Sequence, residues 1–193
     1  LRDRNFDWWD FATQNALTQN YNLGYRYGND KIRSYVSADY YSEEGTIKGF
    51  DYDRFTFRSN TDYVVNDRLT LKAKISGSYK ETDNREYSLA HTSYTPWDTP
   101  WDSHGNVKDG TQGVPTAADA PTANPDDYWY SDGNSNFLYD RLLNWGKTRS
   151  NGIDLGLGFD FKIIDGLTFE SNNRIGFNNS YSSSYVDPNS RSG

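Results

Sequence analysis

The chain has 193 residues, no cysteine and a formal net charge of −7, which excludes a disulfide scaffold, a thiolate metal site and a cysteine nucleophile within it and disfavours a nucleic-acid partner. Hydrophobic residues make up only 34% of the chain while aromatic residues reach 17%, so the apolar content lies largely in rings that tolerate one wet edge. Because no apolar run approaches the roughly 18 to 20 residues of a spanning helix, any membrane crossing would be made by strands.

Residues 1–17 contain the stretch DWWDFATQNA, for which we expect a loop with a short helix. Two interpretations stay open for Trp8 and Trp9. They either dock a partner or anchor the chain at a lipid boundary, where tryptophan is enriched.

Residues 18–80 predict four strands in two hairpins, because apolar and polar residues alternate with the two-residue period of a strand. Short turns at residues 28–30 and 65–68 join the strands of each hairpin. The apolar set comprises Tyr21, Leu23, Tyr25, Tyr27, Ile32, Val36, Ala38, Tyr40, Phe55, Phe57, Tyr63, Leu69, Leu71, Ala73, Ile75 and Tyr79.

Residues 81–147 predict a long loop that is rich in aromatic side chains. Its candidates for substrate binding, whose flat faces would stack on sugar rings or peptide side chains, are Trp97, Trp101, Tyr128, Trp129 and Tyr130. The alternative, and the more common outcome, is that these rings pack the loop against itself or against a partner, because aromatic enrichment marks interfaces of every kind.

The same loop carries five oxygen donors of the kind that bind Ca²⁺: Asp126, Asp127, Asp132, Asn134 and Asn136. Their spacing lacks the terminal Glu of an EF-hand, and such residues are ordinary in loops, so we expect no metal and no other cofactor. His91 and His104 stand without the nucleophile and acid pattern of a triad. We therefore expect no catalytic residue and no enzyme.

Residues 148–181 predict a third hairpin, and residues 182–193 predict the start of the next loop. The apolar set of this hairpin comprises Ile153, Leu155, Leu157, Phe159, Phe161, Leu167, Phe169, Ile175 and Phe177. The six strands are expected to have about 10 to 13 residues each, which is longer than the usual length in globular proteins and near the length that crosses a bilayer at a tilt.

Three features of this pattern favour a membrane setting. The apolar sets contain no Asp, Glu, Lys, Arg or His, and a lipid-facing Arg or Lys near the midplane costs about 2 to 4 kcal/mol. Aromatic rings gather at both ends of the strands, and short turns at one end contrast with long loops at the other. The sequence therefore predicts an all-β fold, an antiparallel transmembrane β-barrel segment with its turns in the periplasm and its loops outside.

The opposite side of the strands is polar and would line the interior of the barrel. Its charged residues are Arg26, Arg33, Arg54, Arg58, Asp62, Lys72, Lys74, Asp154 and Glu170. They either shape the selectivity of a transport path or, more commonly, form cross-strand networks and hold a plug.

Several motifs at fixed spacing resemble the SusC/RagA-like group of TonB-dependent outer-membrane transporters over about 75 residues. They are DWW at 7–9, TQNYNL at 18–23, GNDK at 28–31, EGTIKG at 44–49, RFTFRSN at 54–60 and NDRLTL at 66–71. The stretch IIDGLTFESNNRIGFNNSY at 163–181 is similar to a later hairpin of the same group.

This resemblance implies a 22-stranded barrel in the outer membrane, closed by a plug and energised through the TonB complex. It also implies a SusD-like surface lipoprotein as partner and an oligosaccharide or peptide as cargo. Neither a plug nor a TonB box is found in the sequence, and six strands alone would expose their edges inside lipid. We therefore expect a fragment that holds about a quarter of the barrel.

Alternative functions stay open at this point. A soluble β-sandwich carbohydrate-binding module would bury the apolar side against a second sheet. A passive porin would have physically similar strands, and an adhesin or a barrel enzyme is the third class, although no acid/base pair lies on a rigid strand.

Overall fold

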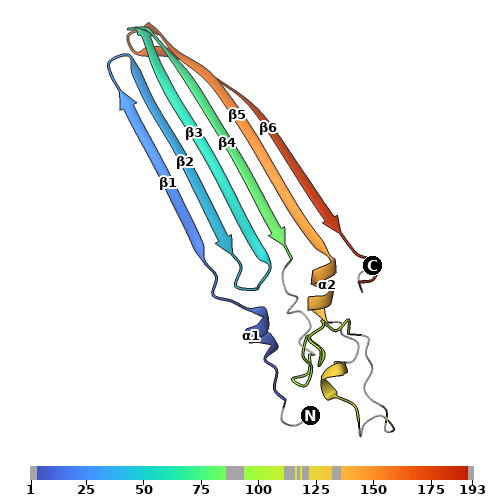
Figure 1. Cartoon of the computed structure of the whole chain (residues 1–193). Helices are drawn as coiled ribbons and strands as arrows, with labels where there is room; N and C mark the ends of the chain where they lie inside the picture. The colour runs from blue at the N-terminus through green and yellow to red at the C-terminus, as the bar shows by residue number, and fades with distance from the viewer. Residues whose placement is uncertain are drawn as a thin grey trace.

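The computed structural model describes residues 4–85, 94–110, 116, 118, 122–131 and 136–190. Six long strands form a single antiparallel sheet in which each strand pairs with its neighbours in the sequence, in the order β1-β2-β3-β4-β5-β6 (Figure 1). The strands are β1 (Thr18–Gly28), β2 (Ile32–Glu44), β3 (Phe50–Asn66), β4 (Leu69–Asn84), β5 (Trp145–Ile164) and β6 (Leu167–Tyr185). The prediction of an all-β antiparallel fold is confirmed.

The register of the sheet joins the apolar set of each strand to that of the next. Tyr40 lies opposite both Tyr21 and Phe55, and Phe55 lies opposite Tyr79. Further along, Leu155 lies opposite both Ile75 and Ile175. Because a slip of one residue would turn a strand over, this in-register pairing gives the sheet one continuous apolar face and one continuous polar face.

Four strands are longer than the sequence pattern predicts. β3 has 17 residues, β4 has 16, β5 has 20 and β6 has 19, against the 10 to 13 expected. In β4 the residues beyond Tyr79 are polar on both faces, so apolar and polar residues no longer alternate and the pattern no longer indicates a strand. The backbone ladder nevertheless continues, pairing Asp83 with Asp51 on one side and with Lys147 on the other.

Neither face of the sheet is covered by a second layer within the described residues. Leu71, Ile75 and Leu155, which a β-sandwich would bury, are 42–46% exposed. Leu157 is 69% exposed. An apolar face of this extent in contact with water alone is not expected of a soluble domain, so it needs lipid or another covering.

The helical segments among the described residues lie at the end of the sheet away from the three short turns (Figure 1). They are α1 (Trp8–Ala12), the 3₁₀ helix η1 (Pro125–Asp127) and α2 (Phe137–Leu143). Asp7 caps α1 by accepting hydrogen bonds from two backbone N–H groups, and Asn136 caps α2 in the same way with one. Within the described part of the chain no helix is both long enough and apolar enough to cross a membrane.

Candidate functional site

An aromatic cluster joins the start of the chain to the long loop between β4 and β5. Its members are Phe6, Trp8, Phe11, Tyr94, Trp101, Trp129 and Phe137. The Trp8 ring stacks on Tyr94 with centroids 4.6 Å apart, and its Nε1 donates a 3.1 Å hydrogen bond to the Thr95 carbonyl. Residues that are far apart in the sequence therefore form a small core at the loop end of the sheet.

A buried carboxylate joins two described stretches of the loop, 94–110 and 122–131. Asp98 is fully buried, and its Oδ1 accepts a 2.6 Å hydrogen bond from the Tyr130 backbone N–H. Its Oδ2 accepts bonds from the hydroxyls of Thr95 at 2.9 Å and Ser131 at 2.5 Å. Because a buried carboxylate is tolerated only when its oxygens have donors, Asp98 fixes the local fold of this loop.

A buried lysine makes a second connection between the same two stretches of the loop. Lys108 is 2% exposed, and its Nζ donates to the Tyr128 carbonyl at 3.1 Å and to Thr99 Oγ1 at 3.3 Å. The ammonium also sits 5.6 Å from the centre of the Trp129 ring, which is a cation–π contact. Burial lowers the pKa of Lys108, and the charge of Asp98 opposes this shift.

The five predicted substrate-binding residues divide into buried and accessible groups. Trp129 is 5% exposed and packs edge-on against Trp8, so its ring belongs to the small core. Trp97 and Trp101 are 41% and 38% exposed, although Trp101 also contacts Phe11 edge-on. Tyr128 and Tyr130 are half-buried. Binding of substrate by these five residues stays a prediction, and Trp97 and Trp101 are its accessible members.

Asp126 and Asp127, two of the predicted oxygen donors, are engaged in other contacts. Asp126 forms an ion pair with Arg4, and Asp127 Oδ1 accepts a 2.9 Å bond from the Ser103 N–H. Asn136 is buried, and its amide donates to the carbonyls of Pro100 and Lys108. Across the ranges that the structure describes, no three His, Cys, Asp or Glu side chains gather as a metal site would require. Asp132, Asn134 and His91 lie outside those ranges, and His104 is exposed.

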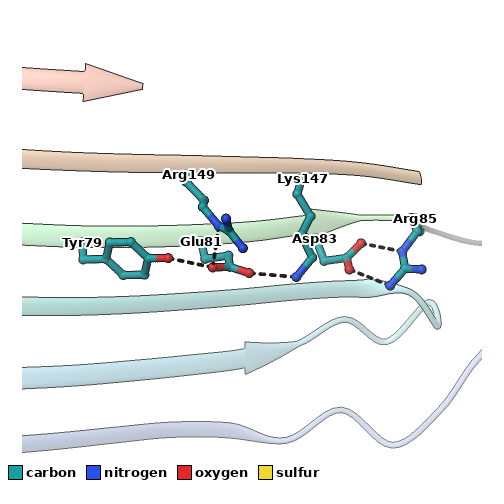
Figure 2. A network of polar contacts seen from close by, with 6 residues as sticks. All are labelled: Tyr79, Glu81, Asp83, Arg85, Lys147 and Arg149. Carbon is teal, nitrogen blue, oxygen red and sulfur yellow. Dashed lines mark hydrogen bonds and ion pairs between the residues drawn. The ribbon is translucent and has the colours of Figure 1, made fainter. Parts of the chain in front are cut away.

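A charged network, which we call the outer rim, occupies the apolar side of β4 and β5 just beyond Tyr79 (Figure 2). Its members are Tyr79, Glu81, Asp83, Arg85, Lys147 and Arg149. Glu81 Oε1 accepts a 2.8 Å bond from Lys147, while Oε2 accepts bonds from the Tyr79 hydroxyl at 2.7 Å and from Arg149 at 3.1 Å. The hydrogen bond from Lys147, followed by those from Tyr79 and Arg149, lowers the pKa of Glu81 to about 2.

The outer rim holds carboxylates close together. In the register of β3 and β4, Glu81 lies opposite Asp53 and Asp83 lies opposite Asp51, and like charges in such positions repel. Arg85 offsets this repulsion by binding both oxygens of Asp83, at 2.8 and 2.7 Å. Sequence reasoning missed the outer rim, although a signal was present, since the odd-numbered residues of β4 change from apolar to charged after Tyr79.

Several of the predicted charges on the polar face form cross-strand contacts. Lys72 pairs with Asp160 at 2.6 Å, and Arg174 pairs with Asp154 at 2.9 Å. Arg54 lies 3.5 Å from Asp39, and the Arg26 guanidinium sits over the Tyr35 ring. The polar face is therefore held by a network that runs across the strands.

Comparison with known proteins finds curated relatives that are TonB-dependent receptors. No family model matches the chain. Three curated relatives from Formosa agariphila are TonB-dependent receptors: P26 is 28% identical over 80 residues, P3 is 27% identical over 79 and P39 is 29% identical over 74. These matches cover 42%, 41% and 38% of this chain, but only 7–8% of the length of each relative.

Solved structures with the same fold match nearly the whole chain. The RagAB peptide importer in the closed-closed state superposes with a TM-score of 0.74 at 17% identity, covering 97% of this chain and 20% of that one. A second structure, of the RagAB peptide transporter, gives 0.68 at 18% identity, covering 94% and 20%.

This antiparallel sheet has one face that is uncharged between the short turns and the row of Tyr79, short turns at one end and a folded loop at the other. Such an arrangement is a segment of a transmembrane β-barrel. The sequence matches to TonB-dependent receptors and the shared fold with the RagAB structures support a SusC/RagA-like barrel segment.

Proposed function

We propose that this chain forms part of the barrel wall of an outer-membrane importer that takes up glycans or peptides with a SusD-like surface lipoprotein and draws its energy from the TonB complex. The observation that carries the proposal is the continuous apolar face of six strands, on which the described residues have no covering layer. The names of the sequence relatives support the TonB-dependent class.

The two faces of the sheet have different roles in this proposal. The apolar face meets lipid, and the row of Tyr21, Tyr40, Phe55 and Tyr79 marks the outer edge of the bilayer, because tyrosine suits a boundary where its ring is apolar and its hydroxyl is wet. The polar face lines the transport path. Glycans and peptides are both polar, so this face offers them hydrogen bonds in place of water.

The folded loop lies at the outer mouth of the barrel in this arrangement. Its small core around Trp129 and Asp98 gives it a defined shape. Trp97 and Trp101 remain accessible on that body and would contact either cargo or the lipoprotein. Transport is not catalysis, so the chain supplies a shaped path and performs no bond chemistry.

Uptake by intact cells tests the proposal. Cells that carry the full-length transporter and cells that lack it would be given fluorescent oligosaccharides and peptides, with and without a functional TonB complex. The proposal expects one cargo class to enter only when both the transporter and TonB are present. Entry that needs the barrel but not TonB would instead indicate a passive porin, and entry that needs neither would contradict the proposal.

A further inference from the structure

A hollow of about 470 Å³ lies on the polar face where β3, β4, β5 and β6 run side by side. Among the residues that line it are Arg58, Asn60, Lys74, Gly156, Gly158 and Asn172. It lies between the short turns and the row of Tyr79, at a level where the opposite face carries no charged residue. A molecule that passes along the polar face would therefore pass this hollow.

Two cations in the hollow lack a counter-ion. Lys72 and Arg174, which also line it, are already paired with Asp160 and Asp154. Arg58 and Lys74 form no ion pair with any residue that the structure describes, and both side chains are exposed.

The register places these two cations close together. Arg58 lies opposite Ser76, and Lys74 is two residues from Ser76 on the same face of β4, so the two are diagonal neighbours. Diagonal neighbours are about 7 to 8 Å apart, and like charges at that spacing repel. An anion placed between them would remove this repulsion and would gain two charge-assisted hydrogen bonds.

Two glycines, Gly156 and Gly158, line the hollow and place no side chain in it. Gly156 lies directly opposite Lys74, where an added Cβ would come within 3.3 Å of the Lys74 Cβ. At Gly158 an added Cβ would lie 2.7 Å from the Ser171 carbonyl oxygen and 2.8 Å from the Asn172 side-chain oxygen. Glycine inside a strand can mark the close approach of a ligand or of another backbone, and at Gly158 the neighbouring backbone is that of Ser171. The amides of Asn60 and Asn172 add neutral hydrogen-bonding groups at the edge.

We propose that this hollow binds carboxylate groups of the transported cargo through Arg58 and Lys74, so that the transporter favours acidic peptides or glycans that contain uronic acids. The proposal rests on the proposed import function and deepens it by naming the chemistry of the cargo. Arg58 supplies the planar fork that fits a carboxylate, and Lys74 supplies a mobile point charge. The competing occupant is a carboxylate of the transporter's own plug.

The test uses the full-length transporter with its partner lipoprotein in cells. Uptake is measured for two matched pairs of probes, a Glu-rich peptide with its Gln counterpart and an oligogalacturonide with its neutral galactan counterpart. The variant is the double substitution Arg58→Ala, Lys74→Ala. The matched control is Lys80→Ala, because Lys80 lies on the same face of β4 but outside the hollow.

The expected result is a loss of about tenfold or more in uptake of the acidic probe relative to its neutral counterpart, because both charge-assisted bonds to the carboxylate are removed. The Lys80 variant and the charge-conserving pair Arg58→Lys, Lys74→Arg should keep most of the preference. Heat-modifiable migration on gels shows that each barrel has folded.

Three results would overturn the proposal. If the double variant keeps the wild-type ratio of acidic to neutral probe uptake, Arg58 and Lys74 do not bind carboxylates of the cargo. An equal loss for both probes, accompanied by leakage of small solutes through the barrel, would assign Arg58 and Lys74 to the plug. If the wild-type transporter imports neither member of either pair, the proposed function fails, and the cargo site fails with it.

Discussion

The Tyr79 hydroxyl donates a 2.7 Å hydrogen bond to Oε2 of Glu81, the next residue on the same face of β4. The Tyr40 hydroxyl does the same across strands, donating to Asp53 at 2.7 Å, and Tyr21 donates to Gln19 at 2.9 Å. In each case the ring lies on the apolar face and the hydroxyl reaches toward the loop end. This recurring contact fixes where the apolar face stops, which a membrane boundary requires.

Replacing Glu81 with Gln should make the barrel less stable at neutral pH and change its response to acid. Lys147, Tyr79 and Arg149 lower the pKa of Glu81 from 4.5 to about 2 in the folded chain, so the folded state binds this proton less readily than the unfolded state. The stabilisation is therefore fully present above about pH 4.5 and is lost as the pH falls through about 2.

Thermal unfolding of the wild type and of Glu81→Gln in detergent, at a series of pH values, checks this. The wild type should have the higher midpoint at pH 7, and the two curves should converge between pH 4.5 and 2. High salt should narrow the difference at pH 7, because these side chains are partly exposed. A difference that stays the same down to pH 2 would show that Glu81 acts through packing alone.

Substitution of Trp129 by Ala should loosen the long loop. The ring is buried in the aromatic cluster, and Trp→Ala in a core costs about 3 to 5 kcal/mol. The matched control is Trp97→Ala, which removes an exposed ring of the same loop and should change stability by no more than about 0.5 kcal/mol. Limited proteolysis of the folded transporter measures both, and equal cleavage of the two variants would contradict the placement of Trp129.

Asp98→Asn should open the same loop by a different route. Asn keeps one acceptor oxygen but places an NH₂ group against donors, and an unsatisfied buried group costs about 1 to 3 kcal/mol. Asp127→Asn is the control, because that carboxylate accepts its bond at the surface and should tolerate the change. Hydrogen exchange at Tyr130, whose N–H binds Asp98, reports the opening. Unchanged protection at Tyr130 would refute the role of Asp98.

An arginine in the middle of the apolar face should destabilise the barrel in lipid. Leu155→Arg would place a charge among Ile75 and Ile175 and should cost about 2 to 4 kcal/mol if that face meets the bilayer. The control Asn22→Arg puts the same charge on the polar face opposite Asp39, where it should be tolerated. Folding yield into vesicles and urea unfolding measure the difference. Equal tolerance of both variants would argue against lipid contact.

The sheet was largely predictable because alternation is a strong signal where the two faces meet different surroundings. In β1, for example, Tyr21, Leu23, Tyr25 and Tyr27 identify both the strand and its orientation. The extra length of β4 and β5 was not predictable, because Lys80 and Glu81 are both charged and the contrast between faces disappears. The number of strands in the complete barrel, 22 by resemblance, stays a prediction.

The loop was much less predictable than the sheet. Trp97 and Trp129 look alike in the sequence, yet one is exposed and the other buried, because burial here depends on contacts with Trp8 more than 80 residues away. Asp98 and Lys108 are of residue types that are mostly exposed, and the structure buries both. No periodic pattern records such irregular packing, so only tertiary structure reveals it.

Spin-label accessibility on the full-length transporter in bilayers tests the central claim most directly. Labels would be placed singly at Leu71, Ile75 and Leu155 on the apolar face, and at the neighbouring positions Lys72, Ser76 and Asp154 on the polar face. The account predicts that the first set is relaxed mainly by oxygen, which concentrates in lipid, and the second set mainly by a water-soluble nickel chelate. Labels on the first set that are shielded from oxygen, or that respond to the nickel chelate, would contradict it.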